Sequence, residues 1–60
     1  MDKKFVVFSF QETLFSEGEP MFWSNEDGWG SLESATVLKE YEAIGIMLVQ
    51  EDAVCVQLPD

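Results

Sequence analysis

The chain has 60 residues, and its twelve acidic residues outnumber its three basic ones, so the formal net charge is −9. This balance disfavours direct binding to nucleic acid or to anionic membranes, because both need Lys and Arg to meet phosphate groups. Hydrophobic residues nevertheless make up 47% of the chain, which is too much for a disordered acidic tail. We therefore expect one compact acidic domain over residues 1–60, near the lower size limit for a stable core.

The residues that most catalytic and metal sites need are missing. The sequence has no histidine, and its one cysteine, Cys55, cannot form an internal disulfide or build a zinc site alone. Its four glycines fit neither the Walker A nor the dinucleotide-binding spacing. Paired carboxylates such as Glu51 and Asp52 could act as acid and base only in a cleft, which a chain of this size rarely forms. We predict that the protein is not an enzyme and binds no cofactor or metal.

Nothing in the sequence predicts a membrane or secreted protein. No apolar run approaches the roughly 20 residues that cross a bilayer. The start, Met1 to Lys4, leads directly into a strand-like segment and lacks a signal-peptide pattern. We expect a cytoplasmic location, with Cys55 as a small core residue.

The first part of the chain predicts two antiparallel strands. Phe5–Phe10 is rich in β-branched and aromatic residues on both faces, which is typical of a central strand. A loop over residues 11–20 leads to a second strand, Pro20–Ser24. Leu14 and Phe15 in this loop either fold back over a sheet edge, which we prefer, or form an exposed apolar contact surface.

A turn over residues 25–28 separates the two tryptophans and predicts a hairpin. We expect Trp23 and Trp29 to be core or half-buried residues rather than an exposed recognition pair, because indole burial stabilises a small domain strongly. The Asn-x-Asp-Gly order also resembles a calcium loop. The ligand positions that such a loop requires hold Trp23 and Ser34, so we exclude calcium.

The second half predicts one helix and at least one strand. A helix is expected over Glu40–Ile44, with Gly45 as a plausible stop. Residues 32–38 fit either the start of this helix or a short strand, and with the strand the helix would run from near Lys39 to about Met47. Residues 46–49 are apolar and could pair as a strand across a turn at 50–52. Ala53–Leu58 has the alternating pattern of a strand, with Val54, Val56 and Leu58 on one face. The predicted fold is α+β, a small antiparallel sheet of three to four strands with one short helix packed on it.

The segment Met21–Leu38, about a third of the chain, carries a resemblance. The sequence Phe-Trp-Ser-Asn-Glu-Asp-Gly-Trp-Gly, followed by Leu-Glu-Ser-Ala-Thr-Val-Leu, resembles short uncharacterised phage and bacterial proteins. Those proteins place an aromatic hairpin before an Ala-Thr-Val-Phe-like strand and an acidic helix, and Leu38 here stands in place of the Phe. The resemblance implies a phage or prophage context, with the host cytoplasm as the location. It favours a short strand over 35–38.

The acidity favours a basic protein partner, although it could also serve only to keep an apolar chain soluble. We predict a small protein-binding module, an inhibitor that presents carboxylates as a nucleic-acid mimic to a basic surface of a host protein. The expected partner-binding residues are exposed turn acids and the aromatic anchors beside them: Glu17, Glu19, Trp23, Glu26, Asp27 and Trp29. The alternative is an assembly module that forms a homodimer through an edge strand, either 5–10 or 53–58.

Overall fold

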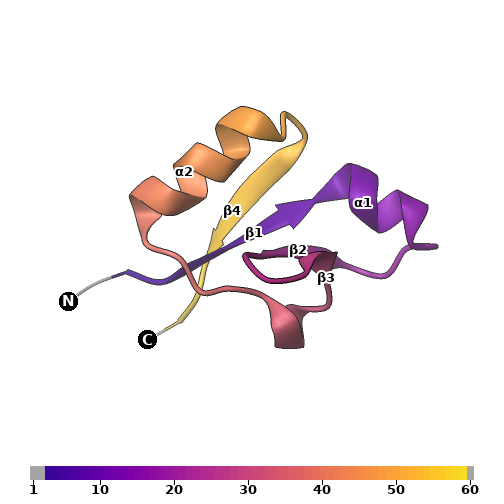
Figure 1. Ribbon diagram of the computed structural model, residues 1–60, viewed down its shortest axis with the longest axis horizontal. Helices are drawn as coiled ribbons and strands as arrows, with labels where there is room; N and C mark the ends of the chain where they lie inside the picture. Colours follow the sequence, from indigo (N-terminus) through magenta and orange to yellow (C-terminus); the bar gives the residue numbers. More distant parts are fainter. Residues whose placement is uncertain (1–2, 60) are drawn as a thin grey trace.

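The computed structural model describes residues 3–59. Its elements, in chain order, are β1 (Phe5–Ser9), α1 (Phe10–Phe15), β2 (Met21–Ser24), β3 (Gly28–Gly30), a single 3₁₀ turn η1 (Leu32–Ser34), α2 (Glu40–Val49) and β4 (Ala53–Gln57). The strands form one antiparallel sheet in the order β3-β2-β1-β4, and α2 packs on one face of it (Figure 1). The predicted α+β class, with a small antiparallel sheet and a helix packed on it, is confirmed.

Strand β1 is the centre of the sheet, as its two apolar faces predict. It pairs with β4 along its whole length and with β2 at Phe8 and Ser9. Beyond that point β2 diverges, and Leu38 takes its place, exchanging two backbone hydrogen bonds of 2.9 and 2.8 Å with Phe5. Val6 and Val7, which point to opposite faces, are 2% and 0% exposed. Of the two strands proposed for self-association, β1 therefore has no free edge.

The core lies between β1, β4 and α2. It is a cluster of five buried residues: Phe5, Val7, Leu38, Ala43 and Ala53. Partly buried hydrophobic side chains pack against this cluster from the hairpin, the helix and the last strand: Trp23, Trp29, Ile46, Met47 and Cys55. The expectation that Trp23 and Trp29 are core or half-buried is confirmed, whereas Cys55, expected in the core, is partly buried and packs against it.

Helix α1 occupies a segment that we expected to be a loop. Its N-cap is Ser9, whose hydroxyl accepts a hydrogen bond from the Glu12 N–H at 3.1 Å. Strand β1 therefore ends at Ser9, and Phe10 begins the helix. The helix extends away from the sheet (Figure 1), leaving Leu14 77% and Phe15 72% exposed. The preferred interpretation, that they cover a sheet edge, was wrong.

The segment from η1 to α2 settles the alternatives for the second half of the chain. Residues 32–38 are neither the start of α2 nor a strand. After the 3₁₀ turn the backbone is extended, the Thr36 N–H donates to the Trp23 carbonyl at 3.0 Å, and Leu38 forms an isolated bridge to β1. Helix α2 does not end at Gly45, because Ile46 and Met47 pack against the core and hold the next turn in place. Residues 46–49 are helical, so the interpretation of this run as a strand was wrong.

Asp52 connects two segments that are far apart in the sequence, residues 9–11 and residues 50–52. One of its carboxylate oxygens accepts hydrogen bonds from the Ser9 hydroxyl at 2.6 Å and the Gln11 N–H at 2.8 Å, and the other accepts from Gln50 Nε2 at 2.6 Å. The Ser9 hydroxyl bond, followed by that of the Gln11 N–H, lowers the pKa of the Asp52 carboxyl below its usual range. Asp52 thereby fixes the start of α1 against the start of β4.

The lowered pKa of Asp52 makes a testable contribution to the pH dependence of stability. Because the folded pKa lies below the unfolded one, the stabilisation is complete above the unfolded pKa and is lost as pH falls through the folded one. We expect Asp52→Asn to lower the urea midpoint at pH 7 and to differ less from the parent at pH 3. Glu51→Gln, at the exposed neighbour, is the control and should leave the midpoint nearly unchanged. An equal effect of Asp52→Asn at both pH values would contradict the assignment.

Candidate protein-binding groove

The β2–β3 hairpin places the two tryptophans opposite helix α2. Trp23 and Trp29 are cross-strand partners on the side of the sheet that α2 covers. Their ring centroids lie 5.4 Å apart at an interplanar angle of 70°, an edge-to-face arrangement that stabilises aromatic pairs. Trp23 Nε1 donates to Asn25 Oδ1 at 2.8 Å, which fixes the ring within its own turn. Both rings are half-buried and keep one part accessible.

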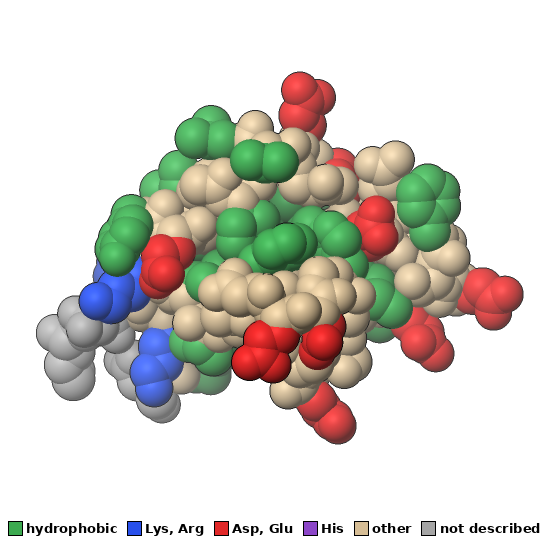
Figure 2. All heavy atoms as spheres, in the orientation of Figure 1, with side chains coloured by type: hydrophobic (Ala, Val, Ile, Leu, Met, Phe, Trp, Pro, Cys, Tyr) green, Lys and Arg blue, Asp and Glu red, His purple; other side chains and the backbone are tan. Residues whose placement is uncertain are grey.

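Helix α2 supplies the other wall of a groove. A hollow of about 200 Å³ lies between the hairpin and the helix, lined by Trp23, Trp29, Gly45, Ile46, Val49 and Gln50. Figure 2 shows hydrophobic side chains gathered in the middle of this face, with acidic side chains standing around them on several sides. Val49 is 86% exposed, so the rim of the groove is apolar as well as its floor. We call this surface the tryptophan groove.

Glycine at position 45 keeps the tryptophan groove open. A Cβ atom built there would meet no atom within 4 Å apart from its own helix, so its absence is not required by packing. A larger side chain at this position would project into free space beside the indole rings. The residue that weakens the helix is therefore also the one that leaves room for a ligand.

The turn at the end of the hairpin carries two exposed acids on a fixed backbone. The N–H groups of Glu26 and Asp27 both donate to the buried Ser24 hydroxyl at 3.2 Å. The preceding Asn25 N–H donates to the Thr36 hydroxyl at 2.8 Å. These bonds fix the backbone of the turn, while the Glu26 and Asp27 carboxylates stay in solvent. The structure thus brings four of the six predicted residues, both tryptophans and this acid pair, onto one hairpin.

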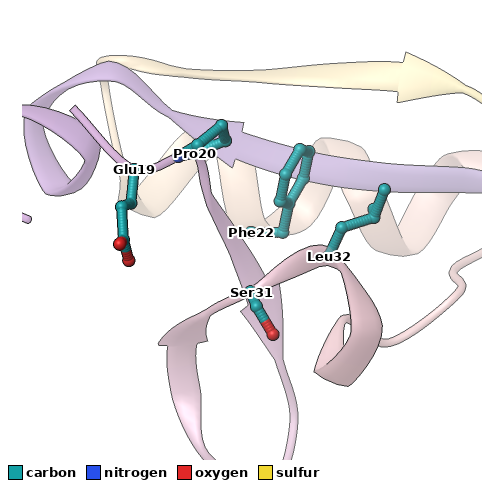
Figure 3. A pocket seen from close by; sticks show the side chains of 5 residues that line it. All are labelled: Glu19, Pro20, Phe22, Ser31 and Leu32. Carbon is teal, nitrogen blue, oxygen red and sulfur yellow. The ribbon is translucent and has the colours of Figure 1, made fainter.

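The other two predicted acids lie elsewhere. Glu17, with a left-handed φ of 59°, and Glu19 follow α1 and precede β2, so the length of β2, roughly 13 Å, separates them from the hairpin turn. Glu19 borders a second hollow of about 370 Å³ with Phe22 and Leu32. In Figure 3 those two side chains lie together on the face opposite α2, and the Glu19 carboxylate points away from them. Glu17 and Glu19 do not belong to the tryptophan groove.

The basic residues gather at one end of the molecule. Lys4 precedes Phe5 and Lys39 follows Leu38, and because Phe5 and Leu38 are antiparallel partners, the two lysines lie opposite each other. Lys3 is the next residue along the chain. Figure 2 shows the basic side chains together at this end. The tryptophan groove and the acidic hairpin turn are left without a basic residue in their linings.

Sequence reasoning missed the helical half of the groove. The expected helix stops at Gly45 or, in the alternative, near Met47, and neither version places Ile46 and Val49 beside the tryptophans. A signal was present in the sequence. Gly45 and Val49 are four residues apart and share a helix face when the helix continues. Whether the helix continues past Gly45 depends on the packing of its last turn against the core, which the sequence alone does not show.

Comparisons with known protein families, with curated proteins and with solved structures found no match to this chain. The resemblance of Met21–Leu38 to short phage and bacterial proteins therefore stays a prediction. Within residues 3–59, no three His, Cys, Asp or Glu side chains come close enough to hold a metal ion. In the same residues no helix has both the length and the apolar character needed to cross a membrane.

Two glycines of the site should respond in opposite ways to the same substitution. Gly45 lies inside α2, so Gly45→Ala should raise the free energy of unfolding by about 0.5–1 kcal/mol. Gly28 closes the hairpin turn at a φ of 78°, so Gly28→Ala should lower it by about 1–2 kcal/mol. An added Cβ meets no atom within 4 Å at either position, so the backbone alone sets the sign. Urea unfolding followed by circular dichroism measures both changes in the free energy of unfolding. Changes of the same sign in the two variants would contradict the prediction.

Proposed function

We propose that this protein is a small protein-binding module that uses the tryptophan groove and the adjoining acidic turn to occupy a basic surface of another protein. The observation that carries the proposal is the combination on one hairpin of two half-buried indole rings and two ordered, solvated carboxylates. Aromatic anchors of this kind are the residues that most often dominate a protein interface. The groove would take one apolar or aromatic side chain, and the acids would meet cationic groups beside it.

The charge of the whole molecule supports a basic partner. With a formal net charge of −9 and its lysines at one end, the remaining surface attracts cationic proteins over a distance of about one Debye length. A basic surface patch is typical of proteins that bind nucleic acid. The module would therefore compete with nucleic acid for that surface, as an inhibitor that mimics its charge.

The resemblance of the hairpin segment to phage proteins supports a more specific form of this proposal. A phage-encoded inhibitor would act in the host cytoplasm on a host protein. The rigid turn suits this role because little conformational entropy remains to be lost on binding. No catalytic role is proposed.

Occluding the groove without changing the charge is the sharpest test. Gly45→Leu places a good helix former where a Cβ meets no atom, fills the space beside the indole rings, and leaves every acid in place. Immobilised parent and variant proteins are compared for capture from lysate at 50 mM and 500 mM NaCl. We expect a basic protein to be retained by the parent at low salt, lost at high salt, and retained at least tenfold less by Gly45→Leu.

Two double variants of equal net charge distinguish the effect of the acidic turn on binding from the effect of net charge alone. Glu26→Gln with Asp27→Asn, and Glu17→Gln with Glu19→Gln, each leave a formal net charge of −7, two units less negative than the parent. The first pair should reduce capture severalfold more than the second, because only the first lies beside the tryptophan groove. Equal losses for the two pairs, or full capture by Gly45→Leu, would show that the groove is not the binding site.

A further inference from the structure

Strand β4 has an open edge, along which the Ala53 N–H alone bonds back to its own chain, to the Gln50 carbonyl at 3.0 Å. It is the last strand of the sheet, with β1 on one side only. The Leu58 N–H donates to the Lys4 carbonyl at 2.8 Å, and hydrogen-bonded pairs alternate along an antiparallel ladder. The backbone groups of Val54 and Val56 therefore point to β1, and those of Cys55 and Gln57 point outward.

One flank of α2 above this edge is apolar and exposed. Ala43 faces the sheet, while Gly45 and Val49 turn toward the hairpin and line the tryptophan groove. At 100° per residue the remaining flank carries three side chains one turn apart. They are 70%, 48% and 79% exposed: Tyr41, Ile44 and Leu48. Since α2 packs on β1 and β4, this flank lies on the β4 side, away from the groove.

We infer that a second copy of this chain binds here, with β4 pairing antiparallel to β4 of the second copy around Cys55. In this register the outward backbone groups of Cys55 meet their own equivalents. The Gln57 N–H meets the Ala53 carbonyl of the second copy, while the Ala53 N–H stays bonded to the Gln50 carbonyl of its own chain at 3.0 Å. Val54 and Val56, 38% and 43% exposed on the uncovered sheet face, become cross-strand neighbours. The four-stranded sheet extends into eight strands.

Antiparallel pairing around Cys55 relates the two copies by a two-fold axis. This axis also brings the apolar helix flanks together. Helix α2 leads from the Phe5 end of the sheet to the Ala53 end, so it is antiparallel to β4. The two helices are then antiparallel to each other, with Ile44 near the axis and Tyr41 facing Leu48 of the second copy. A strand edge alone would accept any extended peptide. The self-complementary helix flank is what selects a copy of this chain.

Charge sets how this contact responds to salt. Strand β4 has no charged residue, so the pairing itself buries none, but two copies of formal net charge −9 repel each other. Screening should therefore strengthen the dimer as salt rises. Binding of a basic partner at the tryptophan groove weakens under the same change, and the two surfaces lie on opposite flanks of α2.

Sedimentation equilibrium at 10–500 μM protein, in 20 mM and 500 mM NaCl, tests the dimer. The parent should dimerise, more tightly at high salt. Gln57→Pro removes the outward N–H of an exposed residue and should weaken the dimer at least tenfold, whereas Gln57→Ala keeps that N–H and should dimerise like the parent. Leu48→Gln should weaken it similarly. Leu14→Gln changes a side chain of matched exposure, 77% against 79%, on α1, which contributes no residue to the proposed contact, and should have no effect.

The outcomes decide between this surface and others. A monomer at 500 μM in both salts, or a dimer that Gln57→Pro and Leu48→Gln leave intact, overturns the inference. If circular dichroism shows that Gln57→Pro is unfolded, the comparison of dimer strength between Leu48→Gln and Leu14→Gln decides alone. Glu26→Gln with Asp27→Asn lies on the hairpin turn and should dimerise at least as tightly as the parent. Failure of the tryptophan groove as a partner site and failure of β4 as a dimer edge therefore give different results.

Discussion

The hydrogen bonds on the two sides of β1 hold together parts of the chain that are otherwise unrelated. On one side β4 pairs with the whole strand, and on the other β2 and then Leu38 complete the ladder. Because both faces of β1 are buried at Val6 and Val7, one short strand organises the hairpin, the extended segment before α2 and the end of the chain. A fold of this size needs such a strand, since it cannot bury two separate cores.

A single helix is enough to cover only part of the sheet, and the exposed features of the molecule follow from that. Helix α2 lies over β1 and β4, so the hairpin is left half covered and a groove remains where the tryptophans meet the helix. The far face of the sheet keeps Phe22 accessible next to Leu32, and the β4 edge stays open. Apolar surface that would be internal in a larger domain is here available for contacts with other molecules.

The strands were predictable because their patterns are local. The run of β-branched and aromatic residues in Phe5–Ser9, the alternation in Ala53–Gln57 and the turn before Gly28 indicate strands and a hairpin without knowledge of the rest of the fold. Helix α1 was not predictable in this way. It has six residues, and the Asp52 carboxylate that binds the Gln11 N–H lies 41 residues further along the chain. A helix this short depends on such distant support.

The tryptophan groove was half predictable for the same reason. The turn chemistry placed Trp23, Trp29 and the Glu26–Asp27 pair on one hairpin. The helical wall needed tertiary information, because the low helix propensity of Gly45 is overcome only by the packing of Ile46 and Met47 against the core. Glu17 and Glu19 were grouped with the tryptophans because of their charge, and a strand of four residues separates them in space.

The gathering of the lysines at one end gives the molecule an electric dipole in addition to its net charge. In the field of a cationic surface the molecule experiences a torque as well as an attraction, and it turns its lysine end away before contact. A fraction of the random orientations at encounter is therefore removed in advance, which raises the rate of productive association without any new contact in the complex. For so small a protein, the arrangement of three side chains is enough to select the face with which it arrives.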